Sequence, residues 1–489
     1  MNQPSIQHYP CYINGEWVNA ANGATFEVSN PANAEVWATV PDCTEQDVKQ
    51  ALETSRTAQL AWQQYPAIER GRYILKLVEV LKPKRDHFAK LLVLEQGKTL
   101  AQAYGEFDDT LNYLTYSAEA ARRLEGNIFP SDNANEQLWI HKVPYGVTLG
   151  LCAFNYPLAL IGRKVGPALV TGNSIILKAH EATPVTASEF CKAVEEAGIP
   201  AGVINLVSGA GIDVSAQLVT SPLTRLVSLT GSTQAGQAIY RSSADNVAGL
   251  VLELGGKASF IVLADADVEK AAEAAVISRY ANCGQVCICN ELVLVADEIA
   301  DEFTAKVIEK ASKLIVGDPM KDGIDMGPSV TAQGLERVHR LLEESVAMGA
   351  KVALGGGRPE GDQFAQGNWY APTVLTDVTR DMPVAKEELF APIMPIIRVK
   401  DYFEALDITN DREDGLSSYL YTQDIGKVMH AIGNMEVGTI FVNRQIVGYV
   451  QGYHSGHKRS GTGGEDGIYG IENYLQKRAV YLAFDAPSA

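Results

Sequence analysis

The sequence predicts an α/β protein, in which short apolar strands alternate with amphipathic helices and form largely parallel sheets. From Val143 onward, short apolar runs end in small or polar residues, and helical segments lie between them. The hydrophobic content of 46% and the charged content of 20% are typical of a soluble globular protein. The 489 residues are enough for two or three structural units.

Residues 12–40 are expected to form short strands. The Asn14-Gly15 pair predicts a hairpin turn, because both residues tolerate the positive φ that a two-residue turn requires. A helix is expected to begin at Thr44, with Asp47 three residues later as the partner in a capping box.

Helical patterns continue, with breaks, to about Arg123. Residues 125–137, rich in polar side chains, predict a boundary or a projecting hairpin. Within residues 67–85, a row of apolar side chains is expected to lie along one side of a helix: Ile74, Leu75, Leu77, Val78 and Leu81.

The alternating part of the chain predicts parallel strands joined by crossover helices, and hence a nucleotide-binding layer. A second α/β unit is expected to begin after Lys257 and to continue to about residue 455, and residues 472–484 have a strand-like pattern. The apolar runs of the first unit occupy residues 146–154, 173–180, 202–209, 225–231 and 250–256.

Composition limits the partners and the compartment. The net charge of −18 argues against nucleic acid or an anionic membrane surface as a partner. No run of eighteen apolar residues and no signal-peptide pattern is evident, and the seven cysteines suit free thiols, so we expect a cytoplasmic protein. Cys283, Cys287 and Cys289 could be metal ligands, but no second cluster has zinc-site spacing, so we expect no metal.

Two residues about thirty positions apart are the candidate reactive groups. Cys287 in the GQVC segment could form a covalent adduct with a carbonyl carbon, because a thiolate is a strong nucleophile. Glu253 in the ELGGK segment could activate a water molecule that releases the acyl group. Taken singly, a core cysteine and a surface charge at a strand end are the simpler interpretations.

The TGSTQAG segment contains Gly231 and Ser232 after a predicted strand, at a longer glycine interval than the usual dinucleotide fingerprint. One interpretation is a tight turn capped by Ser232. The other is that Ser232 and the N–H groups of a helix start hold a pyrophosphate, because such groups are unpaired and carry partial positive charge.

Six motifs occur in an order and at a spacing that resemble those of NAD(P)-dependent aldehyde dehydrogenases. The resemblance covers almost the whole chain. The motifs are FNYP at 154–157, KAHE at 178–181, TGSTQAG at 230–236, ELGGK at 253–257, GQVC at 284–287 and EELFAPI at 387–393.

The resemblance implies a Rossmann-like NAD-binding domain, an α/β catalytic domain and a small β oligomerisation element. It also implies a homodimer or homotetramer, formed through the hairpin and the tail. The expected division is 1–122 and 144–254 for the NAD-binding domain, 255–455 for the catalytic domain, 456–475 for a return to the NAD-binding domain, and 123–143 and 476–489 for the oligomerisation hairpin and tail.

The resemblance also implies a reaction. Cys287 would attack an aldehyde, and the Asn155 side-chain amide and the Cys287 N–H would hold the oxyanion of the thiohemiacetal. After hydride transfer leaves a thioester, Glu253 would activate water and the acid would depart. Lys257 could assist, although a structural ion pair is the simpler interpretation.

The cofactor implied by the resemblance is NAD. Lys178 would contact the adenosine ribose, and Glu181 would bind its hydroxyls and repel the 2′-phosphate of NADP. Glu388 and Phe390 match the residues that hold the nicotinamide ribose and ring. Ala391 stands where the family usually has glycine, which affects how closely the backbone can approach.

The QGYH segment resembles the lactaldehyde and glycolaldehyde dehydrogenase branch, in which residues matching Arg163 and His454 face a small polar substrate. An acidic residue of that branch is replaced here by Gly448 or Tyr449. Arg163 could instead form a structural pair with a carboxylate, and His454 could bond to the backbone.

Several other activities are open at this stage. A succinate-semialdehyde-type dehydrogenase would have the same motifs. A nucleotide-independent thiol hydrolase or esterase would use Cys287, Asn155 and Glu253, but the nucleotide motifs argue against it. A dehydrogenase that transfers the acyl group to coenzyme A would not need Glu253.

Overall fold

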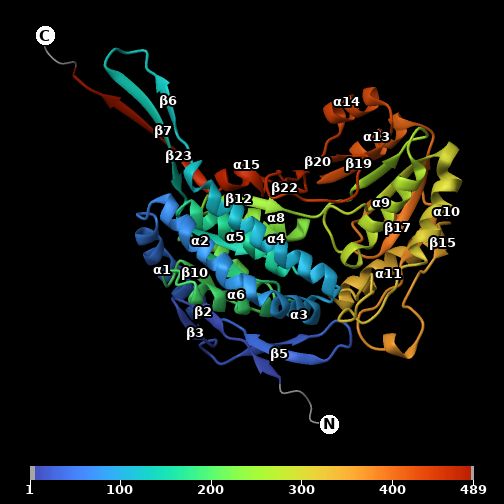
Figure 1. Ribbon diagram of the computed structural model, residues 1–489, viewed down its shortest axis with the longest axis horizontal. Coiled ribbons are helices and arrows are strands. Elements are labelled where there is room, and N and C mark those ends of the chain that lie inside the picture. The colour runs from blue at the N-terminus through green and yellow to red at the C-terminus, as the bar shows by residue number, and fades with distance from the viewer. Residues whose placement is uncertain (1–5, 486–489) are drawn as a thin grey trace.

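The computed structural model describes residues 6–485, which form two large sheets covered by helices, with a thin β arm projecting from one side (Figure 1). Residues 1–5 of the predicted first domain and residues 486–489 of the predicted tail lie outside the described range. The predicted α/β class is confirmed by the parallel strands of both large sheets.

The first large sheet has eight strands in the order β22-β12-β11-β8-β9-β10-β2-β3. Its five central strands are parallel and coincide with the five predicted apolar runs, while β2, β3 and β22 pair antiparallel at the edges. The bounds are β2 Cys11–Ile13, β3 Glu16–Val18, β8 Val147–Leu151, β9 Ser174–Lys178, β10 Ile204–Leu206, β11 Thr224–Thr230, β12 Gly249–Glu253 and β22 Gly461–Thr462.

Both faces of this sheet are buried. In β9, Ile175 and Leu177 pack into one core, and Ile176 between them packs into the core on the opposite face. This alternation follows from the two-residue period of a strand, and it explains why the three successive residues 175–177 are all apolar. The helices on the two faces are α1 Glu45–Trp62, α2 Ala67–Leu81, α3 Arg85–Gln96, α4 Leu100–Glu119, α5 Pro157–Val170, α6 Val185–Glu196, α7 Asp213–Thr220 and α8 Thr233–Ser242.

Local signals near the N-terminus are confirmed with one correction. Asn14 and Gly15 have φ values of 55° and 81° in the turn between β2 and β3. The Asp47 carboxylate accepts the Thr44 N–H at 2.7 Å, as the capping box requires. Leu75 was predicted to lie on the buried side of α2 but is 41% exposed, because one helical residue turns through about 100° and Leu75 follows the buried Ile74.

The second large sheet has seven strands in the order β15-β16-β17-β14-β13-β19-β20, parallel except for β15. Its strands are β13 Ser259–Val262, β14 Leu292–Ala296, β15 Lys351–Leu354, β16 Thr373–Thr376, β17 Ile393–Val399, β19 Ser417–Tyr421 and β20 Thr439–Val442. The helices that follow α8 in the chain are α9 Val268–Tyr280, α10 Ala300–Ala311, α11 Ala332–Ala347, α12 Pro383–Lys386, α13 Tyr402–Asn410, α14 Ile425–Asn434 and α15 Gly467–Glu472.

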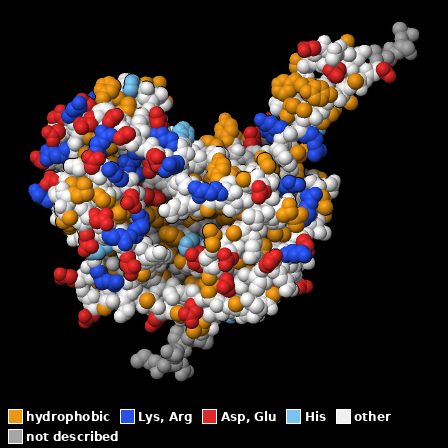
Figure 2. Space-filling model, turned by 180° about the vertical axis from the view of Figure 1, so that it is seen from behind, with side chains coloured by type: hydrophobic (Ala, Val, Ile, Leu, Met, Phe, Trp, Pro, Cys, Tyr) orange, Lys and Arg blue, Asp and Glu red, His pale blue; other side chains and the backbone are white. Residues whose placement is uncertain are grey.

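The projecting arm consists of β6 Asn127–Pro130, β7 Glu136–Pro144 and β23 Leu475–Ala483, and it carries gathered hydrophobic side chains (Figures 1 and 2). The C-terminal strand β23 was expected from residue 472, but it begins at Leu475 because α15 ends at Glu472.

Two small sheets complete the fold. One, near the N-terminus, contains β1 Gln7–His8, β4 Thr25–Ser29 and β5 Val36–Pro41, and the other contains β18 Asp414–Gly415 and β21 His457–Lys458.

Within residues 6–485, no helix has both the length and the apolar character needed to cross a bilayer.

Candidate active site

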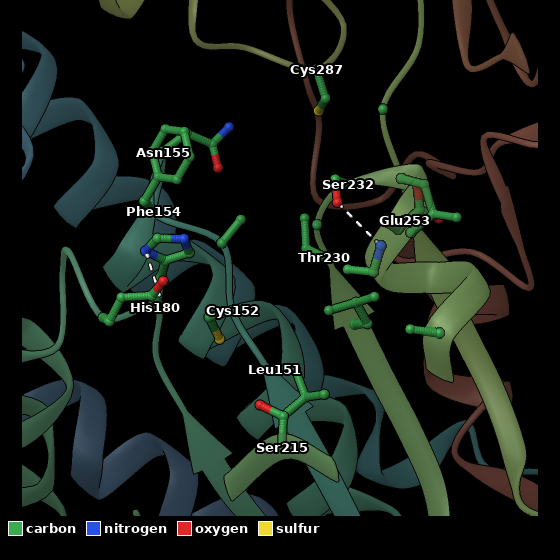
Figure 3. Close-up of a pocket in the computed structure, with 18 of the residues that line it drawn as sticks. Leu151, Cys152, Phe154, Asn155, His180, Ser215, Thr230, Ser232, Glu253 and Cys287 are labelled. Carbon is green, nitrogen blue, oxygen red and sulfur yellow. Dashed lines mark hydrogen bonds and ion pairs between the residues drawn. The ribbon is translucent and has the colours of Figure 1, made fainter. Parts of the chain in front are cut away.

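Three predicted residues line one cavity of about 610 Å³ (Figure 3). Asn155 follows β8, Glu253 is the last residue of β12, and Cys287 lies in the loop after α9. The first two lie at the carboxyl ends of β8 and β12, two parallel strands separated by β11, at the edge where α/β sheets open a crevice for ligands. The fold therefore brings together side chains that are spread between positions 155 and 287 of the sequence.

The Cys287 loop depends on an unusual turn. Asn282, Cys283 and Gly284 have φ values of 48°, 56° and 73°, a left-handed conformation that non-glycine residues rarely adopt. A Cβ atom on Gly284 would lie 2.3 Å from the Ala391 carbonyl oxygen, so this position requires glycine. The Arg279 guanidinium braces the turn by donating to the Gly284 carbonyl at 2.7 Å.

Of the three neighbouring cysteines, Cys287 is the one whose side chain lines the cavity, whereas Cys283 and Cys289 are buried in the protein interior. Burial raises the pKa of Cys287 to about 12, and the positive charge of Arg163 opposes that increase. The thiol form therefore dominates at neutral pH, and removal of its proton requires a base or a favourable electrostatic change.

The Asn155 amide points toward the cysteine loop. Its Nδ2 donates to the Gln285 carbonyl at 3.1 Å, and its Oδ1 has no hydrogen-bond partner within the described part of the chain. Asn155 lines the same cavity as Cys287, and an amide donor in that cavity is the kind of group that a developing oxyanion needs.

Glu253 is 3% exposed, and within residues 6–485 neither of its carboxylate oxygens has a hydrogen-bond partner. Burial, followed by the negative charge of Glu465, raises the pKa of Glu253 well above its usual value, while Arg163 and Lys164 oppose the shift. A carboxylate with a raised pKa is a stronger base than an exposed one.

The two predicted substrate residues lie outside the lining of this cavity. Arg163 forms a two-pronged ion pair with Asp466, with Nε–Oδ1 and Nη2–Oδ2 distances of 2.9 and 2.5 Å. The His454 backbone exchanges two hydrogen bonds with that of Glu465, and burial lowers the pKa of His454 to about 3. Both residues therefore make the structural contacts that the sequence analysis gave as the alternative to facing a substrate.

The nucleotide motifs line the same cavity. Gly231 and Ser232 lie at the start of α8, where Ser232 Oγ caps the helix by accepting the Ala235 N–H at 3.2 Å. Lys178 Nζ lies 3.9 Å from the Glu181 carboxylate at the end of β9. Ser232 therefore caps α8 and also lines the cavity, so the two interpretations of the TGSTQAG segment are compatible.

His180 also lines the cavity, although the sequence did not single it out. Its ring packs edge-on against Phe154, whose ring in turn packs edge-on against Phe390, with centroid separations of 5.2 and 5.8 Å. The signal was present in the KAHE segment, where His180 lies between two predicted contact residues.

Glu388 and Phe390 approach the cavity from the second large sheet. A Cβ atom on Gly255 would lie 2.2 Å from a Glu388 carboxylate oxygen, so the glycine is required for this close approach. Phe390 has a φ of 53°, whereas Ala391 is not among the residues with positive φ. Alanine is therefore compatible with the backbone at a position where glycine was expected.

A buried charge cluster connects the cysteine loop with the Phe390 loop. Glu291 pairs with Arg279 at 2.8 Å and with Lys257 at 3.1 Å, and it accepts the N–H groups of Leu389 and Phe390. Burial alone would raise the pKa of Glu291, but the two cations lower it to about 2. Lys257 therefore forms the structural ion pair that the sequence analysis gave as the simpler interpretation. The sequence did not single out Glu291 as a supporting residue of the site, because its partners are distant in sequence.

Comparison with known proteins identifies the family. The protein-family model described as "Aldehyde dehydrogenase family" matches residues 17–480 of this chain. The chain is 42% identical over 480 residues to a 3,6-anhydro-alpha-L-galactose dehydrogenase of Vibrio sp. strain EJY3, covering 98% of this chain and 100% of the relative. It is 40% identical over 478 residues to a lactaldehyde dehydrogenase of Escherichia coli K12, covering 98% and 99%.

A solved structure of 3,6-anhydro-L-galactose dehydrogenase in complex with NAP has a TM-score of 0.96 and 46% sequence identity, covering 97% of this chain and 100% of that one. The predicted family and fold are thus confirmed along nearly the whole sequence. The protein belongs to the aldehyde dehydrogenase family.

Proposed function

We propose that this enzyme oxidises a small hydroxylated aldehyde to the carboxylic acid, with NAD as the preferred hydride acceptor. The observation that carries the proposal is a single cavity lined by Cys287, Asn155 and Glu253, which continues to the first turn of α8. A nucleophile, an amide donor and a buried carboxylate are thereby placed beside a helix start that can hold phosphate.

The residues present fit a dinucleotide. The start of α8 offers N–H donors, and Gly255 and Glu388 both line the cavity beside it. When bound, the nicotinamide would accept a hydride from the substrate. The residues proposed to hold the dinucleotide are Gly231 and Ser232 at the pyrophosphate, Lys178 and Glu181 at the adenosine ribose, and Glu388 and Phe390 at the nicotinamide end.

Cys287 supplies the nucleophile in the proposed reaction. The thiol loses its proton to solvent water, the sulfur then attacks the aldehyde carbon, and the resulting oxyanion accepts hydrogen bonds from the Asn155 Nδ2 and the Cys287 N–H. One hydrogen of the Asn155 NH2 group is donated to the Gln285 carbonyl at 3.1 Å, which leaves the second hydrogen of that group for the oxyanion. A donor of this kind is worth ~10²–10³ in rate.

Glu253 completes the reaction by taking a proton from the water that attacks the thioester. The free carboxylic acid then leaves, and the Cys287 thiol is regenerated. Neither Glu253 oxygen has a hydrogen-bond partner among the described residues, and Glu253 lines the cavity in which the thioester would form. This role supports hydrolysis rather than transfer of the acyl group to coenzyme A.

The charges near the substrate residues favour a hydroxylated aldehyde over a succinate-semialdehyde-type substrate. Arg163 is already paired with Asp466, and His454 is neutral at physiological pH because its pKa is about 3. A neutral imidazole can exchange hydrogen bonds with a hydroxyl, but it does not offset the charge of a carboxylate. The similarity to dehydrogenases named for lactaldehyde and an anhydro-sugar supports the same class.

The NAD preference rests on Glu181. Its carboxylate lines the cavity and is about half exposed, so it can accept hydrogen bonds from ribose hydroxyls and repel an added phosphate. Lys178 beside it reduces that repulsion in part.

We also propose that the enzyme is a cytoplasmic homodimer or homotetramer. The arm supports self-association, because apolar side chains are exposed on β6 and β23, including Ile128, Phe129 and Tyr481 (Figure 2).

The test is the initial rate of nicotinamide reduction with NAD and with NADP across a set of aldehydes: lactaldehyde, glycolaldehyde, a 3,6-anhydro-sugar aldehyde, succinate semialdehyde, hexanal and benzaldehyde. The expected result is the highest kcat/KM with a hydroxylated aldehyde and NAD. A higher value for hexanal or benzaldehyde would contradict the polar-substrate proposal. Repetition with His454→Ala should change the ranking of the hydroxylated aldehydes.

A further inference from the structure

A buried ammonium group lies directly behind the proposed oxyanion donor. Lys98, between α3 and α4, has no exposed side-chain surface, and its Nζ donates to the Asn155 backbone carbonyl at 2.9 Å. We propose that Lys98 is a positioning residue, which holds the Asn155 loop so that its side-chain amide faces the oxyanion; this inference rests on the function proposed above.

The anionic partner of Lys98 holds the next part of the same loop. Glu106 on α4 forms an ion pair with Lys98, and its second oxygen accepts the N–H groups of Leu158 and Ala159 at 2.8 and 3.2 Å. Those N–H groups belong to the first turn of α5, which begins two residues after Asn155. A carboxylate is favoured there because the first turn of a helix has unpaired donors and partial positive charge. One ion pair therefore fixes both the Asn155 carbonyl and the helix that follows it.

The Lys98 segment also reaches the cysteine loop. Gln96 accepts the Lys98 backbone N–H at 2.9 Å and donates to Asn282 Oδ1 at 3.0 Å. Asn282 Nδ2 then donates to the Asn155 carbonyl at 3.0 Å. The carbonyl of Asn155 thus has two donors, one from the Lys98 side chain and one from the left-handed turn that precedes Cys287.

These contacts are specific to a lysine. An ammonium group has three donors; one serves Glu106, one serves the Asn155 carbonyl, and the group lies 3.9 Å from the centre of the Tyr156 ring. A neutral side chain of the same length would leave the Glu106 carboxylate without its cation and the Asn155 carbonyl with one donor. The loop would then be free to move the amide away from the oxyanion position, where a small displacement is costly to rate.

The first test compares Lys98→Met with Glu95→Gln. Glu95 is a matched control because it is also fully buried and caps a helix in the same layer, accepting the N–H groups of Val185 and Thr186 at the start of α6. The measurement is the rate of the pre-steady-state burst of reduced dinucleotide. The aldehyde and dinucleotide used are those that give the highest activity. We expect Lys98→Met to slow the burst by ~10²-fold, as loss of an oxyanion donor does, and Glu95→Gln to change it by less than about threefold.

The second test is a double-mutant cycle with Asn155→Ala. If Lys98 acts through Asn155, the double variant will be no slower than Asn155→Ala alone, because the group that Lys98 positions is already absent. Multiplicative losses in the double variant would overturn the inference and assign Lys98 a general structural role. Dinucleotide affinity and the rate at which iodoacetamide alkylates Cys287 should stay within about threefold of the parent enzyme in every variant, which a merely structural defect would not allow.

The outcomes also separate this inference from the proposed function. An unchanged burst in Asn155→Ala would remove Asn155 from the oxyanion site and overturn both. A slow Asn155→Ala variant together with an unaffected Lys98→Met variant would overturn the positioning role alone. If Lys98→Met does not fold, Lys98→Met/Glu106→Gln removes both buried charges together, and the same slow burst is expected from it.

Discussion

His454 Nε2 lies 3.4 Å from a carboxylate oxygen of Glu253. This distance places the predicted substrate residue beside the proposed hydrolytic base, although the two are about two hundred positions apart. Because His454 is neutral at physiological pH, it can hydrogen-bond to Glu253, to a substrate hydroxyl or to an attacking water without adding charge. The residue proposed to recognise the substrate therefore lies where it can also influence hydrolysis of the thioester.

Cys287→Ala should lower dehydrogenase activity by at least ~10⁴-fold, because the covalent step loses its nucleophile. Binding of NAD, measured by calorimetry, should stay within about threefold of the parent enzyme. Cys283→Ala and Cys289→Ala are the matched controls, since both thiols are buried away from the cavity. Appreciable turnover by Cys287→Ala, with loss of activity in a control, would move the nucleophile to that neighbour.

Glu253→Gln should form the acyl-enzyme but hydrolyse it slowly, because hydride transfer precedes the step that needs the base. We expect a burst of NADH close to one equivalent per active site, followed by turnover slowed by ~10²-fold or more. Intact-protein mass spectrometry should detect the acyl adduct on Cys287. A normal burst without an adduct would argue against Glu253 as the base.

The hydrolysis rate of the acyl-enzyme should rise with pH. Only the ionised Glu253 can take a proton from water, and burial, reinforced by Glu465, raises its pKa well above the usual 4.5. The rate therefore increases as pH rises through that elevated pKa and is low beneath it, even though Arg163 and Lys164 moderate the shift. Single-turnover hydrolysis measured from about pH 5 to 9 checks this; a flat profile would show that Glu253 titrates below the range or is not the base.

Glu181→Ser should raise the ratio of kcat/KM with NADP to that with NAD by roughly tenfold, which corresponds to about 1.4 kcal/mol. The substitution removes the carboxylate that repels the 2′-phosphate and leaves Lys178 nearby to attract it. Glu181→Gln should produce much of the same change, whereas Glu181→Asp should retain the preference for NAD. If all three variants keep the parent ratio, another residue sets the preference.

A stop codon after Tyr474 should convert the proposed oligomer to a smaller species, because it removes β23 and leaves β7 with an unpaired edge. Tyr474 is retained because it is buried and its carbonyl accepts a hydrogen bond from Asn173. Light scattering measures the mass, and far-ultraviolet circular dichroism checks the fold. Tyr481→Lys is a milder companion, since this exposed side chain lies on β23 and should weaken assembly without removing the strand. An unchanged mass for the truncated enzyme would exclude the arm from the interface.

The sequence by itself determined the features that depend on neighbouring residues. Strand β9 was predictable because residues 175–177 form a short apolar run that ends in polar residues, and the α1 start was predictable because Thr44 and Asp47 are three positions apart. The order and spacing of the six motifs were sufficient to predict the family, and the resemblance implied that Asn155 and Glu253 would share the site that they line.

The tertiary structure decided which partner each charged side chain takes. Arg163 could have faced a substrate, but it pairs with Asp466, which lies 303 positions away. Lys98 and Glu291 carried no signal as site-supporting residues, because their contacts with Asn155 and Phe390 join distant segments. Ion pairs and hydrogen bonds depend on distances of a few ångströms, and these distances are set by how helices and sheets pack rather than by spacing along the chain.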